Sequence, residues 1–342
     1  MGPDVRRSLI GMATVVAGLH IIGFGGLLMF STPHTLTLGA GVLAYSLGLR
    51  HAIDPDHLAA IDNVTRSLNA RAGRDGRRPW SVGFWFSLGH AIVVFGLVAL
   101  LAAGVRSLAS ELSSDDSRLH TLTGVIGPSV SGVFLWALGL ANLAAIVGVA
   151  RVFGAMRHGR FSEDELEHHL ASRGLLNRVL RPVTRTVREP WHMYPVGFLF
   201  GLGFDTATEI GLLALAGGSA MLELPFYAVL VLPVLFAAGM ALVDTVDEAT
   251  TNAAYDWALA RPIRRVYYSL AVTSVSVLLA LSIGTIELLD VAGVPTVGID
   301  GLGVVVLSVL ALAWAAAAAI WHFGRIEQRW GEVRPFSVAS PG

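Results

Sequence analysis

The chain has 342 residues, of which 54% are hydrophobic and 14% are charged, whereas about 25% of the residues of an ordinary soluble protein are charged. This composition indicates an all-α, polytopic membrane protein rather than a soluble one. The lack of cysteine excludes disulfides and thiolate metal sites, and the net charge of −1 excludes a global field that would attract nucleic acid.

Eight apolar runs are long enough to cross a hydrocarbon core of about 30 Å as helices, and they form one transmembrane domain over residues 1–342. In chain order the expected spans are residues 8–30, 37–62, 81–104, 122–150, 192–217, 225–247, 266–288 and 299–323. Arg6 and Arg7 precede the first span as in a signal peptide. The run exceeds the usual signal-peptide core of about 7–15 residues, so we expect it to stay uncleaved.

The arginines indicate how the spans are oriented. They gather before span 1 and after spans 2, 4, 6 and 8, for example from Arg66 to Arg78. The connections on the opposite side, such as those after spans 1, 3 and 7, hold few arginines. Cytoplasmic connections carry the excess of basic residues, so both termini are expected in the cytoplasm. Residues 155–190 then form a basic cytoplasmic loop, where His168 and His169 are expected on a solvated helix, the alternative being a surface metal site.

Span 2 contains the most polar sequence inside any apolar run, with His51, Asp54, Asp56 and His57 within seven residues. A central Asp in a transmembrane helix costs about 2.5–3.5 kcal/mol, so such residues usually face a cavity and have a function. Imidazole and carboxylate together suit divalent first-row metals. Pro55 should break the helix, because it lacks an N–H and clashes with the carbonyl four residues earlier, which lets the four side chains converge.

Spans 3, 5 and 6 add further polar groups. His90 stands alone in span 3, either as a hydrogen-bonded core histidine or, beside the span 2 cluster, as a ligand or a residue that supports one. Asp205 and Glu209 share a helix face in span 5, where two like charges need a proton or a cation between them. Asp244 and Asp247 lie towards the end of span 6.

The charges of these four spans do not balance. Arg50 is the one basic residue assigned to them, so their carboxylates need protons or a cation, and cation transport follows more naturally than anion transport. Asp62 and Asn63 either line a cytoplasmic exit or begin the membrane interface. Glu248 is expected at the cytoplasmic rim.

A weak internal similarity favours an inverted repeat of spans 2–3 and 5–6. Residues 47–54 align loosely with 202–209, and residues 89–93 align with 239–243. Spans 2 and 5 run in opposite directions, as inverted repeats of secondary transporters do.

These motifs resemble those of the nickel/cobalt transporter family. Residues 50–63 resemble its His-x4-Asp-His signature, and residues 86–90, 202–209 and 239–247 are similar to its other motifs. The resemblance covers spans 2 to 6 in order. Pro55 stands where many members have Ala, and Glu248 stands where Gly is common, which leaves the ion preference open.

The resemblance implies high-affinity uptake of Ni²⁺, Co²⁺ or both through the bacterial inner (plasma) membrane. It implies His51, Asp56 and His57 as primary ligands, with Asp54 and His90 next. Asp205, Thr206, Glu209, Asp244 and Asp247 would complete the site or the path. The ion is the substrate, so neither a prosthetic group nor an enzyme activity is expected. No Walker A motif is present, so membrane potential or an ion gradient is the expected drive, without an ATPase subunit.

Two other readings stay open. One is a transporter of another divalent cation such as Mn²⁺, Zn²⁺ or Fe²⁺, because a His/Asp site binds all of these. The other is a membrane metal sensor that does not move the ion. An intramembrane metallohydrolase is disfavoured, because the His-Glu-x-x-His motif does not occur.

Overall fold

A computed structural model gives the structure of the chain, and in the part it describes the regular elements are all helices. It describes residues 3–31, 38–75, 80–103, 118–157, 187–202, 209, 211–216, 225–259, 262–296 and 302–323. The helices are α1 (Pro3–Phe30), α2 (Leu38–His51), α3 (Pro55–Asp75), α4 (Val82–Ala102), α6 (Arg118–Arg157), η1 (Pro190–His192), α9 (Met193–Phe200), α11 (Phe226–Val229), α12 (Val231–Leu259), α13 (Pro262–Val291) and α14 (Gly303–Phe323).

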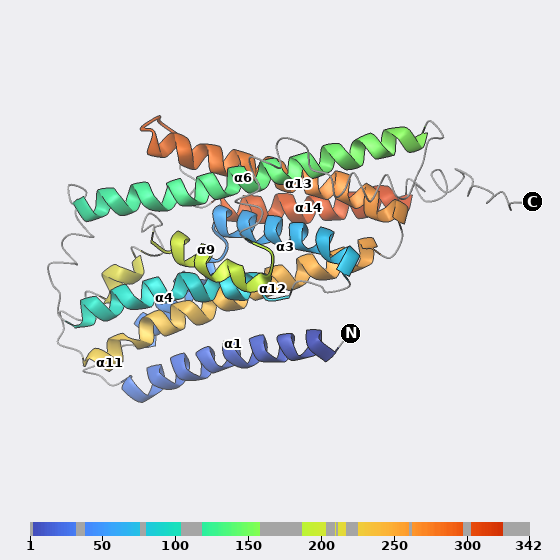
Figure 1. Cartoon of the computed structure of the whole chain (residues 1–342). Coiled ribbons are helices and arrows are strands. Elements are labelled where there is room, and N and C mark those ends of the chain that lie inside the picture. The colour runs from blue at the N-terminus through green and yellow to red at the C-terminus, as the bar shows by residue number, and fades with distance from the viewer. Residues whose placement is uncertain are drawn as a thin grey trace, which may run out of the picture.

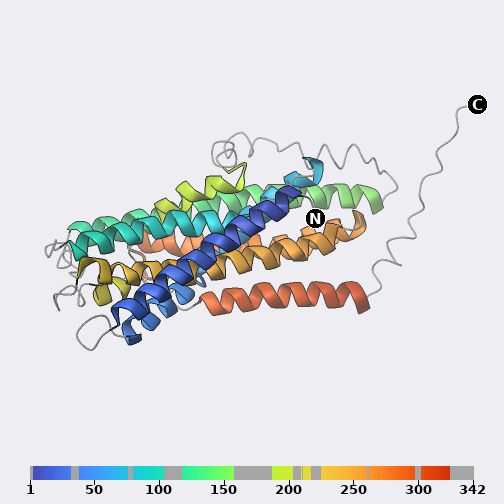
Figure 2. The ribbon, with the colours of Figure 1, turned by 90° about the horizontal axis from the view of Figure 1, so that it is seen from below.

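The long helices run beside one another as a bundle (Figure 1). Six stretches are long and apolar enough to cross a membrane: Val5–Phe30, Val82–Ala102, Val125–Gly148, Phe226–Ala253, Leu270–Val291 and Gly303–Phe323. They coincide with six of the eight expected spans, so the chain is a multi-pass membrane protein. The beginning of α1 and the end of α14 lie at the same end of the bundle, and α1 crosses the other helices obliquely (Figure 2).

The other two expected spans are not single long helices in the described part of the chain. Residues 37–62 are divided between α2 and α3, and residues 192–217 contain the eight-residue α9. In span 2 the break interrupts the apolar helix, and broken helices are tolerated at membrane depth where they line a site. In span 5, residues 203–208, 210 and 217 lie outside the described residues.

The break between α2 and α3 follows the sequence prediction. The backbone N–H of Asp54 donates to the carbonyl of His51 at 2.9 Å, which closes a tight turn, and Pro55 begins the next helix. Proline suits the first helical position because its missing N–H has no intrahelical partner there. The start of α14 supports the turn from outside: a Cβ on Gly303 would lie 1.7 Å from the carbonyl oxygen of Ile53.

Glycines let α2 and α12 cross at close range. A Cβ on Gly48 would lie 2.0 Å from the carbonyl oxygen of Phe236, and one on Gly239 would lie 2.6 Å from that of Tyr45. A side chain at either glycine would push the helices apart, as at other small-residue contacts in membranes. The crossing holds the end of α2 against α12.

Helices α4 and α9 cross in the same way. A Cβ on Gly89 would lie 1.9 Å from the carbonyl oxygen of Tyr194, and one on Gly197 would lie 2.0 Å from that of Phe86. In both crossings, each glycine meets the carbonyl three residues before its partner glycine. One helix of each pair carries Tyr-x-x-Gly and the other carries Phe-x-x-Gly.

Two apolar clusters pack on either side of the helix break. One contains Ala52 and Phe236 with residues of α2, α4 and α12, and the other contains Leu58 and Phe86 with residues of α3, α6, α9, α13 and α14. Polar side chains that lie between these clusters are therefore shielded from lipid.

Candidate metal site

Three histidines converge at the break. His51 ends α2, His57 lies in the first turn of α3, and His90 belongs to α4. All three are buried, and one ring nitrogen from each lies within 4.8 Å of the others. The sequence predicts that the break brings His51 and His57 together and leaves the role of His90 open. The structure places His90 in the same cluster.

Two buried carboxylates adjoin the histidines. Glu209 Oε1 lies 2.7 Å from His90 Nε2 and 3.8 Å from His51 Nε2. Asp244 Oδ2 lies 3.6 Å from His57 Nδ1. Both side chains are about as buried as the histidines, so five separate segments of the chain contribute to one polar cluster.

Asp54 and Asp56 occupy different positions around the break. Asp54 Oδ2 lies 2.9 Å from His51 Nδ1, which leaves the Nε2 atom of His51 directed at His90. Carboxylates commonly fix metal-binding histidines in this way and strengthen them as ligands. Asp56 is partly exposed in the first turn of α3. It does not belong to the described group of converging side chains, which consists of the three histidines.

Several buried polar atoms of the cluster have no hydrogen-bond partner among the described residues. They are Nδ1 and Nε2 of His57, Nδ1 of His90 and Oδ1 of Asp244. Leaving a buried donor or acceptor unsatisfied costs about 1–3 kcal/mol. Imidazole nitrogens beside carboxylate oxygens form a donor set that suits a divalent first-row ion, which would satisfy these atoms.

Asp247 and Glu248 follow Asp244 on α12. The Oδ2 atom of Asp247 is buried and has no hydrogen-bond partner within the described ranges. Glu248 is buried, and its Oε2 accepts a hydrogen bond from the backbone N–H of Gly83 at 3.0 Å. This bond satisfies one of the free N–H groups at the start of α4, a capping role that hydropathy alone does not reveal. Asp205, Thr206, His168 and His169 lie outside the described residues.

Sequence reasoning missed two parts of this region. Ser87 donates a hydrogen bond to Asp244 Oδ2 at 2.5 Å, and its position one turn before His90 was the available signal. Arg66, expected in a cytoplasmic connection, is buried in α3, where Nε lies 2.7 and 2.8 Å from the two oxygens of Asp62. The i, i+4 spacing of the pair was the signal there.

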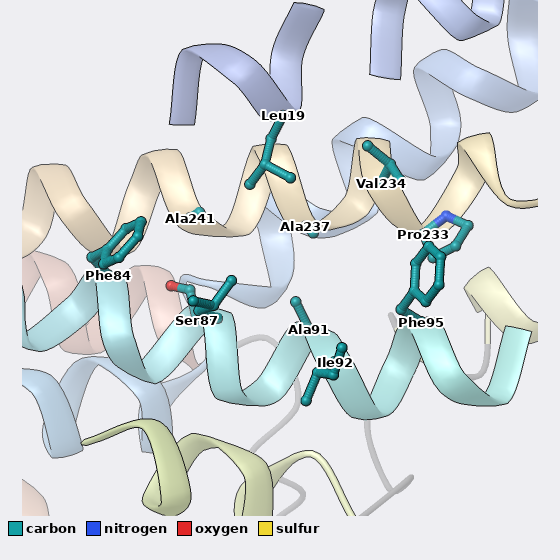
Figure 3. A pocket seen from close by; sticks show the side chains of 11 residues that line it. Leu19, Phe84, Ser87, Ala91, Ile92, Phe95, Pro233, Val234, Ala237 and Ala241 are labelled. Atoms are coloured by element: carbon teal, nitrogen blue, oxygen red, sulfur yellow. The ribbon is translucent and has the colours of Figure 1, made fainter. Parts of the chain in front are cut away.

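An apolar cavity lies on the other side of Ser87, between α1, α4 and α12. It has a volume of about 240 Å³, and Ser87 provides the polar side chain among its lining residues, with Leu19, Phe84 and Phe95 among the others (Figure 3). An apolar cavity cannot replace the hydration shell of a divalent ion. This cavity is therefore not a candidate ion site, whereas the histidine cluster is one.

The fold is that of a multi-pass, α-helical membrane protein with a buried cluster of imidazoles and carboxylates at a broken helix. The family model described as high-affinity nickel-transport protein matches residues 37–320, and the chain belongs to this NicO family, whose members are transporters.

Curated relatives match over most of their length. The nickel transporter NicT of Mycobacterium tuberculosis is 48% identical, over 93% of this chain and 90% of that protein. The nickel transporter NixA of Staphylococcus aureus is 40% identical, over 95% and 97%. The cobalt transport protein NhlF of Rhodococcus rhodochrous is 35% identical, over 93% of each chain. No solved structure matches the chain significantly.

Proposed function

We propose that this protein carries Ni²⁺, Co²⁺ or both into the bacterial cytoplasm with high affinity, through the histidine cluster at the break of span 2. The observation that carries the proposal is the convergence of three buried histidines from three helical segments. Relatives named as nickel and cobalt transporters support the choice of ions. The ion is the transported substrate and not a resident cofactor.

The ligand roles follow from the geometry. His51, His57 and His90 supply the imidazole nitrogens, and Glu209 and Asp244 complete the site with oxygen. A partly dehydrated divalent ion can then exchange water for five protein groups within one buried cluster.

The remaining predicted residues serve the path or the geometry. Asp54 orients His51, and the partly exposed Asp56 lies at the approach to the cluster. Asp247 follows the cluster along α12. For Asp205 and Thr206, the resemblance of span 5 to the family motif remains the basis of the proposal.

The proposed topology has eight spans, both termini in the cytoplasm and an inverted repeat. The beginning of α1 and the end of α14 lie at the same end of the bundle, which supports both termini on one side of the membrane (Figure 1). The paired glycine crossings support the repeat. Helix α2 of span 2 crosses α12 of span 6, and α9 of span 5 crosses α4 of span 3. Exchanging spans 2–3 with spans 5–6 therefore converts one crossing into the other. The broken α2/α3 and the short α9 would occupy matching positions, as discontinuous helices do in other transporters.

The crossings favour a different register for the proposed repeat. The proposed register matches Gly48 with Gly197 and Gly89 with Gly239, which are 149 and 150 residues apart in the chain. The alignment of residues 47–54 with 202–209 differs from this register by six residues. The ring contacts agree with the new register: the His51 ring lies 5.4 Å from Phe236, and Phe200 lies 5.1 Å from Phe86.

Membrane potential is sufficient as the proposed drive. A divalent ion that crosses about 100 mV gains about 4.6 kcal/mol, twice the value for a single charge. This corresponds to an accumulation of more than 1,000-fold, since about 1.4 kcal/mol is a factor of ten. Neither hydrolysis nor a further subunit is then required.

Uptake of radioactive nickel and cobalt at nanomolar concentration, in cells that express the chain, tests the proposal. We expect saturable uptake that His57→Ala abolishes and that His322→Ala, at an exposed histidine near the end of α14, leaves intact. Protein in the membrane is quantified for both variants. Uptake of manganese, zinc or iron in place of nickel and cobalt would overturn the ion assignment, and binding without uptake would indicate a sensor.

A further inference from the structure

A polar strip continues from the histidine cluster along the interface of α3 and α12. It begins at Asp244 and continues through Asp247 on α12 and Asp62 on α3. It then reaches Asn69, whose Nδ2 donates to Oδ1 of Asn252 at 2.6 Å. The strip leads towards the end of the bundle where α1 begins and α14 ends (Figure 1). A polar strip between apolar clusters is the favourable route for an ion that leaves the cluster.

Arg66 lies across this strip. Its guanidinium contacts Asp62 through two nitrogens, with Nε 2.7 Å from Oδ2 and a terminal nitrogen 2.7 Å from Oδ1. It also stacks over the Trp314 ring of α14, 5.6 Å from the centroid. The side chains of Arg66 and Asp62 are 2% and 4% exposed. The protein therefore keeps a buried positive charge beside the route that a cation would follow.

We propose that Arg66 is the exit gate of the transporter: a tethered cation that occupies Asp62 until an arriving metal ion displaces it. The inference rests on the proposed function. Asp62 on α3 lies close enough to Asp247 for charge–charge interaction, so the ion and the guanidinium compete for it. While Arg66 holds Asp62, its charge also repels a divalent ion from the route.

Asp247 gives the guanidinium a second place to bind. It lies close enough to Arg66 and Asp62 for charge–charge interaction, and its buried Oδ2 has no hydrogen-bond partner in the part of the chain that the structure describes. Arg66 can therefore exchange one carboxylate for the other without entering lipid. A buried arginine with a single carboxylate partner could not move in this way, because leaving that partner would strand the charge.

The test measures nickel binding and nickel flux with the purified full-length chain. In detergent, the wild type should bind one Ni²⁺. Arg66→Gln should bind two, because Asp62 and Asp247 are left without their cation and retain a second ion. In vesicles loaded with nickel, release through this variant should fall at least 10-fold. A merely structural role for Arg66 would not raise the stoichiometry.

Two further variants and a control complete the test. Asp62→Asn/Arg66→Gln should return the stoichiometry to one, and release should be at least as fast as in the wild type. Arg66→Lys, which keeps the charge but loses the two-nitrogen contact, should fold and release nickel at least 3-fold faster. The control is Arg6→Gln, at an exposed arginine of α1, which should match the wild type.

The outcomes separate the two proposals. If Arg66→Gln binds one ion and releases it at the wild-type rate, the gate is wrong. If that variant does not fold, wild-type release by Arg66→Lys also overturns the gate. If the wild type neither binds nor moves nickel, the proposed function fails independently of Arg66.

Discussion

The Nε2 atoms of His51 and His90 lie 3.0 Å apart, although the residues belong to different helices and are 39 positions apart in the chain. Glu209 approaches both from a third segment, 2.7 Å from His90 Nε2. Two imidazole nitrogens this close can share one proton or bind one cation, but they cannot both carry protons without repulsion. The contact therefore places the centre of the proposed nickel site between α2 and α4.

Replacement of His90 tests this position. We expect His90→Ala to weaken nickel binding by at least 100-fold, since it removes one ligand and leaves Glu209 without its imidazole partner. The loss exceeds the range of about 10–100-fold that is typical of residues outside the ligand shell. Titration calorimetry of the purified protein measures it, with His322→Ala as the control. Wild-type affinity in His90→Ala would move the site back to the α2/α3 break alone.

Replacement of Asp54 separates an orienting carboxylate from a ligand. Asp54→Asn should weaken nickel binding by about 10–100-fold, because His51 loses the charged partner that fixes its ring. Asp56→Asn should have a smaller effect on binding at equilibrium, since Asp56 is partly exposed and lies outside the converging histidines. Dissociation constants of the two variants, compared with the wild type, decide between them. The reverse order would restore Asp56 as the primary ligand.

The sequence predicts the part of the cluster that comes from a single segment of the chain. Two histidines, two carboxylates and a proline within residues 51–57 predict both the polar site and the break. The resemblance to the family implied His90 and Glu209, but the residues alone could not assign them to the cluster, because which side chains meet depends on how α2, α4 and span 5 are rotated and crossed. The glycines at these crossings were visible in the sequence, but their partners were not.

Loop charge did not predict the position of every arginine. Counting Arg66 as a loop residue agreed with the positive-inside pattern, because four more arginines follow it up to Arg78. Its burial depends on Asp62 one turn earlier and on Trp314 in a distant helix. A hydropathy count cannot register such a pair, since it scores each residue without its neighbours.

The glycine crossings can be tested through stability. Gly48→Ala should lower the free energy of unfolding by about 1–3 kcal/mol, the usual cost of overpacking a well-packed site. Gly197→Ala should have a comparable effect at the matching crossing. The control is Gly25→Ala, since a Cβ there has open space around it. Thermal unfolding in detergent measures all three, and a crossing variant as stable as the control would contradict the close approach.

The contact between α14 and the helix break links a distant helix to the metal site. A Cβ on Gly303 would collide with the carbonyl oxygen of Ile53, which belongs to the turn between His51 and Asp54. We therefore expect Gly303→Ala to shift this turn, to disturb the contact between Asp54 and His51, and to weaken nickel binding by about 10-fold, at the lower end of the range for supporting residues.

This effect should reach binding although Gly303 contributes no ligand. Nickel dissociation constants for Gly303→Ala and for the control Gly25→Ala measure it, at equal amounts of folded protein. If the Gly303 variant lost stability but kept its nickel affinity, α14 would only pack against the break. A loss of affinity in the folded variant would mean that α14 sets the position of His51 and Asp54, because the turn they flank is the part of the site that Gly303 touches.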